Sequence, residues 1–289
     1  MTVVSVLKYQ ALGNDFLVFL DPSDLPGTDE VDAAFVVAVC DRHRGVGADG
    51  ILVVRPAKAD GVGRPVDGRV ADVRLELRNA DGGRAETSGN GIRCLALALV
   101  DAKIVPGPDV LVSTDAGPRL VTVLADNGPG SAMVRTEMGI LQVGDAERAP
   151  RLGAGFEARH VDVGNPHLVL MGDSLEGVDI GDLGRSLEDA KPDGQNVEFV
   201  APDGLGGLDL LVWERGAGLT EACGTGSCAA AAAARAAGLV GDRVEVHNPG
   251  GTLVVELTGE LSAPSVWLSG PARRVLRAEL FPSEIDGFG

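Results

Sequence analysis

Aromatic side chains are scarce in this chain: seven Phe, two Trp and one Tyr make up 3% of its 289 residues. A surface that binds nucleic acid by base stacking needs such rings. Basic residues are also outnumbered, 25 Lys and Arg against 42 Asp and Glu, and the formal net charge of −17 disfavours contact with phosphate groups and anionic lipids. We therefore expect no nucleic acid and no membrane as partner, and a core built from Val, Leu and Ala.

Cysteines and long apolar runs are scarce as well. The four cysteines, Cys40, Cys94, Cys223 and Cys228, show no metal-ligand spacing, and their even number alone is a weak sign of disulfides. No apolar run approaches the ~18 residues of a membrane span. The N-terminus lacks an apolar segment followed by a small-residue cleavage site. The sequence therefore predicts a reduced, cytoplasmic protein that holds no metal.

Glycine is abundant, and one glycine-rich segment has the spacing of a dinucleotide-binding loop. Residues 45–50, GVGADG, follow a predicted helix at 31–42 and precede a predicted strand at 51–55. A dinucleotide loop has the reverse order, strand and then helix. We therefore do not predict a dinucleotide site here.

The most informative stretch is WERGAGLTEACGTGSCAAAAAAR, residues 213–235. Its alanines are strong helix formers, and Cys223 stands just before them at the expected helix start. Unpaired N–H groups and the helix dipole attract anions there, so a carboxylate could bind and Cys223 could ionise more readily than a free thiol. Glu214, nine positions before Cys223, and the adjacent Arg215 match an amino group and a second carboxylate.

The same pattern occurs earlier in the chain. Ser88-Gly89-Asn90-Gly91 resembles Cys223-Gly224-Thr225-Gly226, because both read small nucleophile, Gly, polar residue, Gly, and then helix. Residues 13–16 and 164–167 form a second matching pair, GNDF and GNPH. The chain thus reads as a diverged duplication. Two helix starts that face each other would hold one carboxylate and offer one acid–base group to each face of the adjacent carbon. That arrangement suits inversion of configuration at a carbon that bears a proton.

The remaining pattern predicts many short strands and one main helix in each half. The strongest linker signal is DNGPG at residues 126–130. We therefore place a first domain at 1–127 and a second at 128–269. The predicted strands are 3–8, 16–20, 51–55, 70–77, a hairpin at 110–124, 133–138, 160–163, 168–171, 196–200, 208–213, 243–248, 251–257, 265–268 and 275–281. Helices are expected at 31–42, from 88 to about 103 and after 223, with a helix or short turns at 175–187 and an exposed loop at 58–68.

Seven short motifs, in order, resemble the diaminopimelate epimerase family: GNDF at 13–16, NADG at 79–82, GNGIRC at 89–94, GNPH at 164–167, NV at 196–197, ERG at 214–216 and ACGTG at 222–226. The resemblance spans nearly the whole chain. It implies an α+β fold of two similar domains, each a mostly antiparallel β-sheet or barrel wrapped around a central α-helix, with the active site in the interdomain cleft. It also implies that residues 270–289 return to the first domain and that the protein is a homodimer.

By the same resemblance, the protein is a cofactor-independent isomerase that interconverts LL- and meso-2,6-diaminopimelate, a small diamino dicarboxylic acid, in lysine and peptidoglycan precursor synthesis. The catalytic positions are Cys223 and Ser88. His167 is either a further site residue or a structural hydrogen-bonding histidine. The implied substrate-binding residues are Asn14, Asn79, Gly89, Asn90, Asn165, Asn196, Glu214, Arg215, Gly224 and Thr225.

Ser88 stands where the family has a second catalytic cysteine. A hydroxyl is a far weaker acid than a thiol, and its alkoxide is hardly populated near neutral pH without a neighbouring base. Several interpretations stay open: a natural serine variant that still epimerises, a relative that isomerises another amino acid or performs altered chemistry, a binding protein that has lost catalysis, or an engineered substitution.

Overall fold

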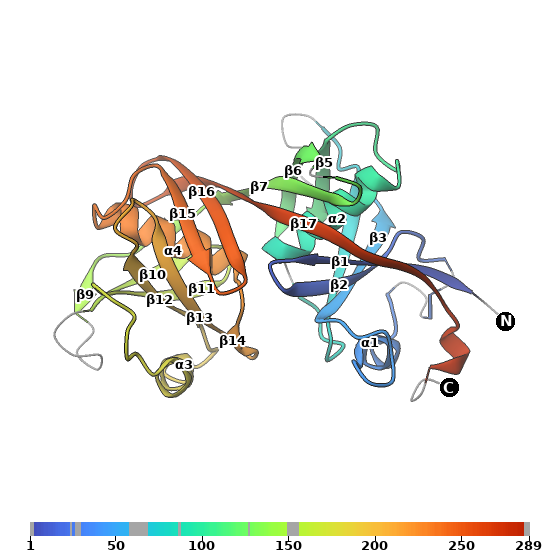
Figure 1. Cartoon of the computed structure of the whole chain (residues 1–289), viewed down its shortest axis with the longest axis horizontal. Coiled ribbons are helices and arrows are strands. Elements are labelled where there is room, and N and C mark those ends of the chain that lie inside the picture. The colour runs from blue at the N-terminus through green and yellow to red at the C-terminus, as the bar shows by residue number, and fades with distance from the viewer. Residues whose placement is uncertain are drawn as a thin grey trace. The chain divides into compact units, whose positions relative to one another are not determined.

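The computed structural model describes residues 3–23, 25–26, 30–57, 69–85, 88–126, 128–148 and 156–285. By its internal contacts the chain divides into two compact units, Met1–Thr136 with Pro271–Gly289, and Glu137–Gly270. The chain leaves the first unit within strand β7 (Ser131–Ile140) and returns to it within strand β17 (Pro264–Leu280), as Figure 1 shows. The predicted loop at 58–68 and residue 127 of the predicted linker lie outside the described residues.

The first unit is built mainly of antiparallel strands, and each of its parallel pairs is bridged by a helix. Its further elements are β1 (Val4–Ala11), β2 (Asn14–Phe19), α1 (Ala33–Cys40), β3 (Gly50–Pro56), β4 (Val73–Asn79), α2 (Gly89–Asp101), β5 (Asp109–Thr114), β6 (Gly117–Asp126) and a 3-10 turn at Pro282–Glu284. Strand β2 pairs in parallel with β3 across α1, and β4 pairs in parallel with β5 across α2. Parallel neighbours need such a crossover.

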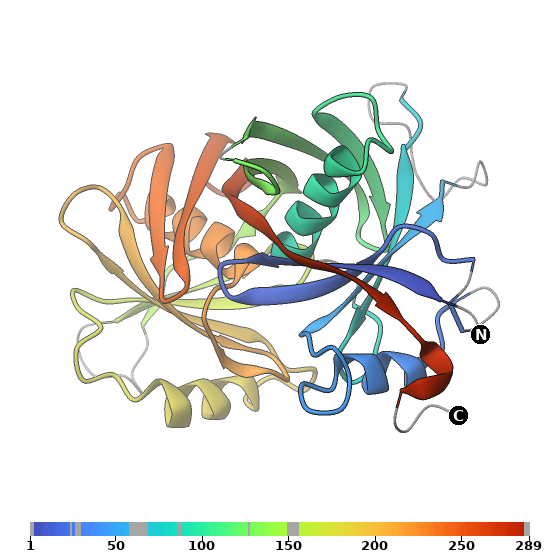
Figure 2. The same ribbon diagram turned by 45° about the vertical axis from the view of Figure 1, so that its right-hand side comes forward.

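Helix α2 forms the centre of the first unit. All of its residues from Gly89 to Leu99 are buried, and it contacts β1, β2 and β6 (Figure 2). A helix that is buried on all sides belongs to the core of its unit and not to its surface. Small residues such as Ala96 and Ala98 let the strands approach it closely, while Leu95 and Leu99 fill the space around them.

Strand β17 runs without a break where the sequence predicted two strands, 265–268 and 275–281. Gly270-Pro271 lies between these two ranges, and proline lacks the N–H that a strand ladder uses. In the structure Pro271 lies between the stretch paired with β16 (Gly251–Gly259), which ends at Ser269, and the stretch paired with β1, which begins at Arg273. The missing N–H therefore interrupts neither of these two ladders.

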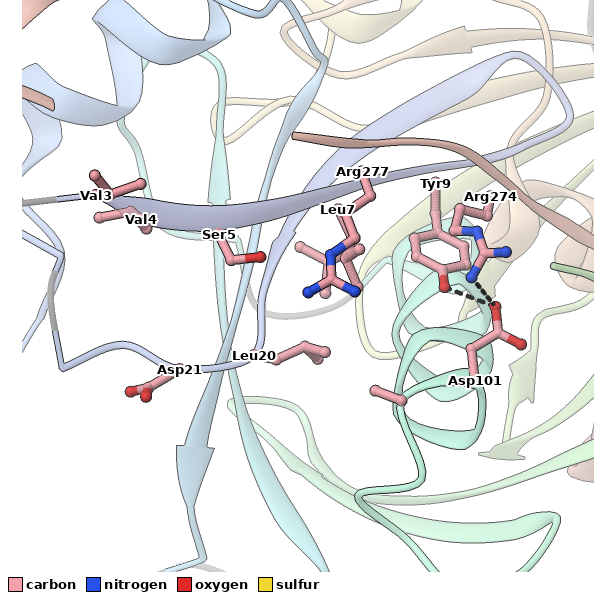
Figure 3. Close-up of a pocket in the computed structure, with 12 residues that line it drawn as sticks. Val3, Val4, Ser5, Leu7, Tyr9, Leu20, Asp21, Asp101, Arg274 and Arg277 are labelled. Atoms are coloured by element: carbon pink, nitrogen blue, oxygen red, sulfur yellow. Dashed lines mark hydrogen bonds and ion pairs between the residues drawn. The ribbon is translucent and has the colours of Figure 1, made fainter. Parts of the chain in front are cut away.

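The returning end of β17 is also held to α2. Tyr9 on β1 donates to Asp101 Oδ2 at 2.8 Å, and Arg274 on β17 reaches the same oxygen at 3.4 Å (Figure 3). Burial, and then the hydrogen bond to Asp101, raise the pKa of Tyr9. These residues border a cavity of about 570 Å³ whose lining belongs to the first unit and includes none of the predicted site residues.

The second unit repeats the order of the first. Its elements are β8 (Gln142–Val143), β9 (Glu147–Arg148), β10 (Glu157–Asp162), β11 (Pro166–Met171), α3 (Ile180–Glu188), β12 (Asn196–Pro202), β13 (Leu208–Glu214), β14 (Gly218–Thr220), α4 (Gly224–Ala236), β15 (Arg243–Asn248) and β16. Strand β11 pairs in parallel with β12 across α3, and β13 pairs in parallel with β15 across α4. This repeat, and the buried helices α2 and α4, confirm the predicted fold class of two similar α+β domains.

Helix α4 is the counterpart of α2. Its alanines from Ala229 to Ala234 are at most 1% exposed, so the polyalanine run is a core helix against which strands pack closely. Within the described ranges, no helix combines the length and the apolar character that a membrane crossing needs.

Candidate active site

Ser88 begins the central helix of the first unit. It is the N-cap of α2, with an extended backbone (φ −142°, ψ 119°), and its Oγ accepts a hydrogen bond from Gly91 N at 3.0 Å. A serine oxygen here satisfies one of the N–H groups left open at a helix start. The buried guanidinium of Arg93 donates to Gly89 O at 3.0 Å and to Asn90 Oδ1 at 2.7 Å. The predicted residues Ser88, Gly89 and Asn90 thus form one helix start that is bonded to a buried positive charge.

Asn14 joins this helix start from the turn between β1 and β2. Its Oδ1 accepts from Asn90 Nδ2 at 3.4 Å, and its Nδ2 donates to Asp49 Oδ2 at 2.6 Å. Asn79, the last residue of β4, is exposed and is the register partner of Gly50, the residue after Asp49. The structure therefore brings Asn14 and Asn90 into contact and places Asn79 at a neighbouring strand end.

Two carboxylates that the sequence analysis did not select hold the Asn14 turn. Arg42 donates to both oxygens of Asp15, at 3.1 and 2.8 Å, and to Asp49 Oδ1 at 2.7 Å, while Lys8 Nζ lies 2.7 Å from Asp15 Oδ2. Burial by itself would raise the pKa of Asp15, but Arg42 and Lys8 outweigh it, and the pKa is lowered. A signal was available for Asp15, because it follows Asn14 directly, whereas Asp49, inside the segment 45–50, is brought to the turn only by the pairing of β3 with β2.

Cys223 begins the central helix of the second unit with the same geometry. It is the N-cap of α4, with an extended backbone (φ −118°, ψ 117°), and its Sγ accepts from Gly226 N at 3.3 Å. Its thiol also lies 3.4 Å from the hydroxyl of Thr225. The side chain is buried, in contrast to the partly exposed Ser88. Cys223, Gly224 and Thr225 thus form the second predicted helix start.

The prediction that Cys223 ionises more readily than a free thiol is wrong. Burial raises the pKa of the Cys223 thiol well above its ordinary value, and the negative charges of Glu214 and Glu198 raise it further. Hydrogen bonds from Thr225 and from Gly226 N act in the opposite direction but do not compensate. The prediction considered only the helix start, whereas burial and the carboxylates of Glu214 on β13 and Glu198 on β12 determine the direction of the shift.

Glu214 and Arg215 follow each other at the end of β13. Burial raises the pKa of Glu214, and a hydrogen bond that its carboxylate accepts from Thr220 partly opposes this shift. The backbone N–H of Arg215 donates to Asn196 Oδ1 at 3.0 Å, and Asn196 Nδ2 donates to Pro166 O at 3.2 Å. Asn196 therefore ties the end of β13 to the start of β11, and its predicted contact with a substrate has to be made beside these two bonds.

His167 and Asn165 lie at the start of β11 with a carboxylate that the sequence analysis missed. The Nδ1 atom of His167 is 2.7 Å from Glu198 Oε1, and its Nε2 atom is 3.0 Å from Asn165 Oδ1. Glu198 has no exposed surface and His167 is 1% exposed. The available signal was a glutamate inside the apolar stretch NVEFV of the predicted strand at 196–200.

A cavity of about 590 Å³ in the second unit collects several of these side chains. Asn165, His167 and Arg215 line it, and Lys191 and Asp193 contribute further charge. The carbonyl of Asp193 accepts from Arg215 Nη1 at 3.3 Å. Among the residues that the structure describes, no three His, Cys, Asp or Glu side chains gather as they would around a metal ion.

Known proteins match this chain over nearly its full length. The family model of diaminopimelate epimerase matches residues 6–143 and 159–275. A diaminopimelate epimerase from Acidothermus cellulolyticus is 37% identical, with 99% of this chain and 99% of that protein covered. One from Prochlorococcus marinus is 35% identical, with 98% of this chain and 94% of that protein covered.

Solved structures of much lower identity share the fold. A phenazine biosynthesis protein of the PhzF family from Bacillus anthracis superposes with a TM-score of 0.71 at 14% identity, covering 97% of this chain and 100% of that one. A hydroxyproline epimerase from Agrobacterium vitis gives 0.66 at 18% identity, covering 96% and 92%. At such identities the likeness concerns architecture alone. The family match and the full-length relatives, in contrast, reach every motif of the two helix starts, and the chain belongs to the diaminopimelate epimerase family.

Proposed function

We propose that the protein interconverts LL- and meso-2,6-diaminopimelate by moving the α-proton, without a cofactor. The observation that carries the proposal is the pair of matched N-caps, Ser88 on α2 and Cys223 on α4. Each accepts a hydrogen bond from the third residue of its helix, Gly91 or Gly226. Inversion needs one proton-transferring group for each face of the carbon, and one cap from each unit supplies such a pair.

The substrate's reacting carboxylate binds at the two helix starts, where N–H groups lack intrahelical partners and the dipole favours an anion. The distal carboxylate pairs with Arg215, whose guanidinium can hold it with two parallel hydrogen bonds. The distal ammonium goes to Glu214. The reaction requires both helix starts to contact the same α-carbon. The full proposed set is Ser88, Gly89, Asn90, Asn14 and Asn79 from the first unit, and Cys223, Gly224, Thr225, Asn165, His167, Asn196, Glu214 and Arg215 from the second.

Substrate binding also generates the base. In the unbound protein Cys223 is a neutral thiol, because burial, Glu214 and Glu198 all raise its pKa. A substrate ammonium beside Glu214 cancels one of these negative charges, and the substrate's own positive charge favours a thiolate nearby. Ionisation is thereby restricted to the occupied site, which limits side reactions of the thiolate.

Ser88 is the weaker of the two groups. The helix start and Arg93, which is bonded to Gly89 and Asn90, stabilise negative charge near its oxygen. A hydroxyl still gives up its proton far less readily than a thiol. Because the reverse reaction crosses the same transition state, this difference affects both directions of the reaction. A positioned acid–base group contributes roughly 10²–10⁴-fold to a rate. We therefore expect the Ser88→Cys variant to turn over at least about tenfold faster than the natural sequence.

We further propose that the protein acts in the cytoplasm, in lysine and peptidoglycan precursor synthesis, and that it is a homodimer, as its family membership suggests. Light scattering after size-exclusion chromatography tests the dimer. The expected mass is twice that of one chain, and a monomeric mass at working concentration would contradict this part of the proposal.

Proton NMR of LL-diaminopimelate in D2O tests the reaction itself, because loss of the α-proton signal and appearance of the meso isomer are seen separately. The natural sequence is compared with Ser88→Cys and with Cys223→Ala, whose unchanged circular dichroism would show an intact fold. We expect exchange and inversion in the first two and neither in the third. If only Ser88→Cys reacts, the substrate is right and the serine has silenced the enzyme. If none reacts, the proposed function is wrong, and activity of Cys223→Ala would contradict the role of the thiol.

A further inference from the structure

Glu198 is a fully buried carboxyl group on β12 that is not among the residues proposed to contact the substrate. Its Oε1 atom lies 2.7 Å from Nδ1 of His167. Its Oε2 atom is buried and has no hydrogen-bond partner among the residues that the structure describes. An ionised carboxylate in such a place is costly unless a positive charge or a proton accompanies it. His167 is the group in position to provide either.

The other ring nitrogen of His167 determines how many protons the pair holds. His167 Nε2 lies 3.0 Å from Asn165 Oδ1, which is an acceptor. A ring nitrogen that bonds to an acceptor must carry a hydrogen. Nε2–H therefore donates to Asn165, and a second proton is shared between Nδ1 and Glu198 Oε1. With both protons present, Glu198 and His167 together carry no net charge.

We propose that Glu198 is a positioning residue: it keeps both ring nitrogens of His167 protonated, and His167 in turn holds the Asn165 amide with its Nδ2 donor turned toward the cavity. Asn165 and His167 line that cavity together with Arg215. A donor fixed beside a guanidinium suits a carboxylate oxygen of the substrate. The identity of this ligand rests on the proposed function, whereas the protonation of His167 does not.

The titratable groups that face this pair belong to two further elements. Glu214 lies at the end of β13 and Cys223 at the start of α4, and both interact electrostatically with Glu198. His167 acts on Glu214 in the opposite direction, lowering its pKa. The proton on His167 therefore offsets the carboxylate of Glu198 where three acidic groups would otherwise lie together.

Nitrogen-15 NMR of the histidine side chains, recorded near neutral pH without substrate, tests the protonation. The His167→Gln variant identifies the signals of His167 among the four histidines. We expect two protonated ring nitrogens in the natural sequence and one in Glu198→Gln. Glu245→Gln is the matched control, because it removes a carboxylate from the exposed surface of the same unit, and it should retain two. A single ring proton in the natural sequence, or two in Glu198→Gln, would overturn the proposal.

Kinetics of the same variants test the orientation of Asn165. In Glu198→Gln, a neutral His167 ring can accept a hydrogen bond from the introduced amide or from a reversed Asn165. If the two arrangements are equally populated, the competent fraction halves and KM rises about twofold. We expect Glu198→Gln to raise KM for diaminopimelate by at least this factor with a smaller change in kcat, and Glu245→Gln to change neither. An unchanged KM beside a lost ring proton would refute the positioning role. Absence of turnover in the natural sequence would count against the proposed function, while the NMR result would still decide the protonation.

Discussion

Replacing Gly226 with alanine tests how tightly the cysteine cap is packed. A methyl group there would lie 2.8 Å from Glu198 Oε1 and 3.3 Å from Cys223 Sγ. Glu198 is held by His167 at 2.7 Å and cannot retreat freely. At the equivalent position in the first unit, Gly91, the nearest atoms belong to the Leu52 and Ser88 side chains at 3.2 Å, so a shift of a few tenths of an ångström suffices.

The comparison between the two glycines isolates the packing cost. Alanine gains about 1 kcal/mol over glycine in a helix interior, and this gain is shared by both variants. Overpacking a filled core costs roughly 1–3 kcal/mol. We therefore expect Gly226→Ala to be about 1–3 kcal/mol less stable toward unfolding than Gly91→Ala, and to lose most of its activity, because Glu198 and Cys223 must both move.

Urea unfolding measures this difference. Tryptophan fluorescence reports on the second unit, because Trp213 and Trp267 both lie there, and far-UV circular dichroism reports on both units. Glu198→Ala removes the obstructing oxygen, so the double variant Gly226→Ala/Glu198→Ala should be no less stable than Glu198→Ala alone. The inferred contact would be wrong if Gly226→Ala were as stable as Gly91→Ala. It would also be wrong if the double variant were less stable than Glu198→Ala alone.

Three further predictions concern charge and hydrogen bonding. Tyr9→Phe removes the hydrogen bond to Asp101 and should lower the free energy of unfolding by about 1 kcal/mol in urea titrations; no change would mean that water replaces the bond at no cost. The lowered pKa of Asp15 stabilises the fold above the ordinary carboxyl pKa of 3.8, and this contribution is lost as pH falls through the lowered value. Asp15→Asn should therefore destabilise the protein most near neutral pH and progressively less in acid, and an equal effect at every pH in thermal unfolding would contradict this. Glu214→Gln removes a charge that raises the pKa of Cys223. Alkylation of the thiol by iodoacetamide should therefore begin at lower pH than in the natural sequence. An unchanged dependence of the alkylation rate on pH would argue against the electrostatic contact.

The sequence predicted those parts of the site that depend on consecutive residues. Ser88 and Cys223 were identifiable as caps because a small polar residue, spaced glycines and a run of helix formers follow one another in the chain. The turns that carry Asn14 and Asn165 were identifiable for the same reason. The duplicated fold followed from these local patterns, since each unit needs an apolar helix to fill its sheet.

Contacts between distant segments could not be predicted in this way. The strand pattern around Glu198 does not reveal that β11 places His167 against it, or that α4 covers it. The raised pKa of Cys223 has the same origin, because its causes are burial and carboxylates from β12 and β13. Similarly, Asp49 is recognisable as part of the Asn14 turn only when β3 lies beside β2.

The two helix starts share a backbone geometry but differ in their electrostatic surroundings. Cys223 is buried beside Glu214 and Glu198, both of which oppose its ionisation. Ser88 is partly exposed, and its helix start is bonded to the guanidinium of Arg93. A group with an intrinsically acidic proton thus stands in negative surroundings, and one with a weakly acidic proton stands at a helix start whose Gly89 and Asn90 oxygens accept hydrogen bonds from a guanidinium. Both differences bring the proton affinities of the two groups closer together, and proton transfer in two directions through one transition state requires such a match. The surroundings of Ser88 therefore favour a working acid–base group over an inert replacement, and they predict that a thiol introduced by Ser88→Cys ionises more readily than Cys223.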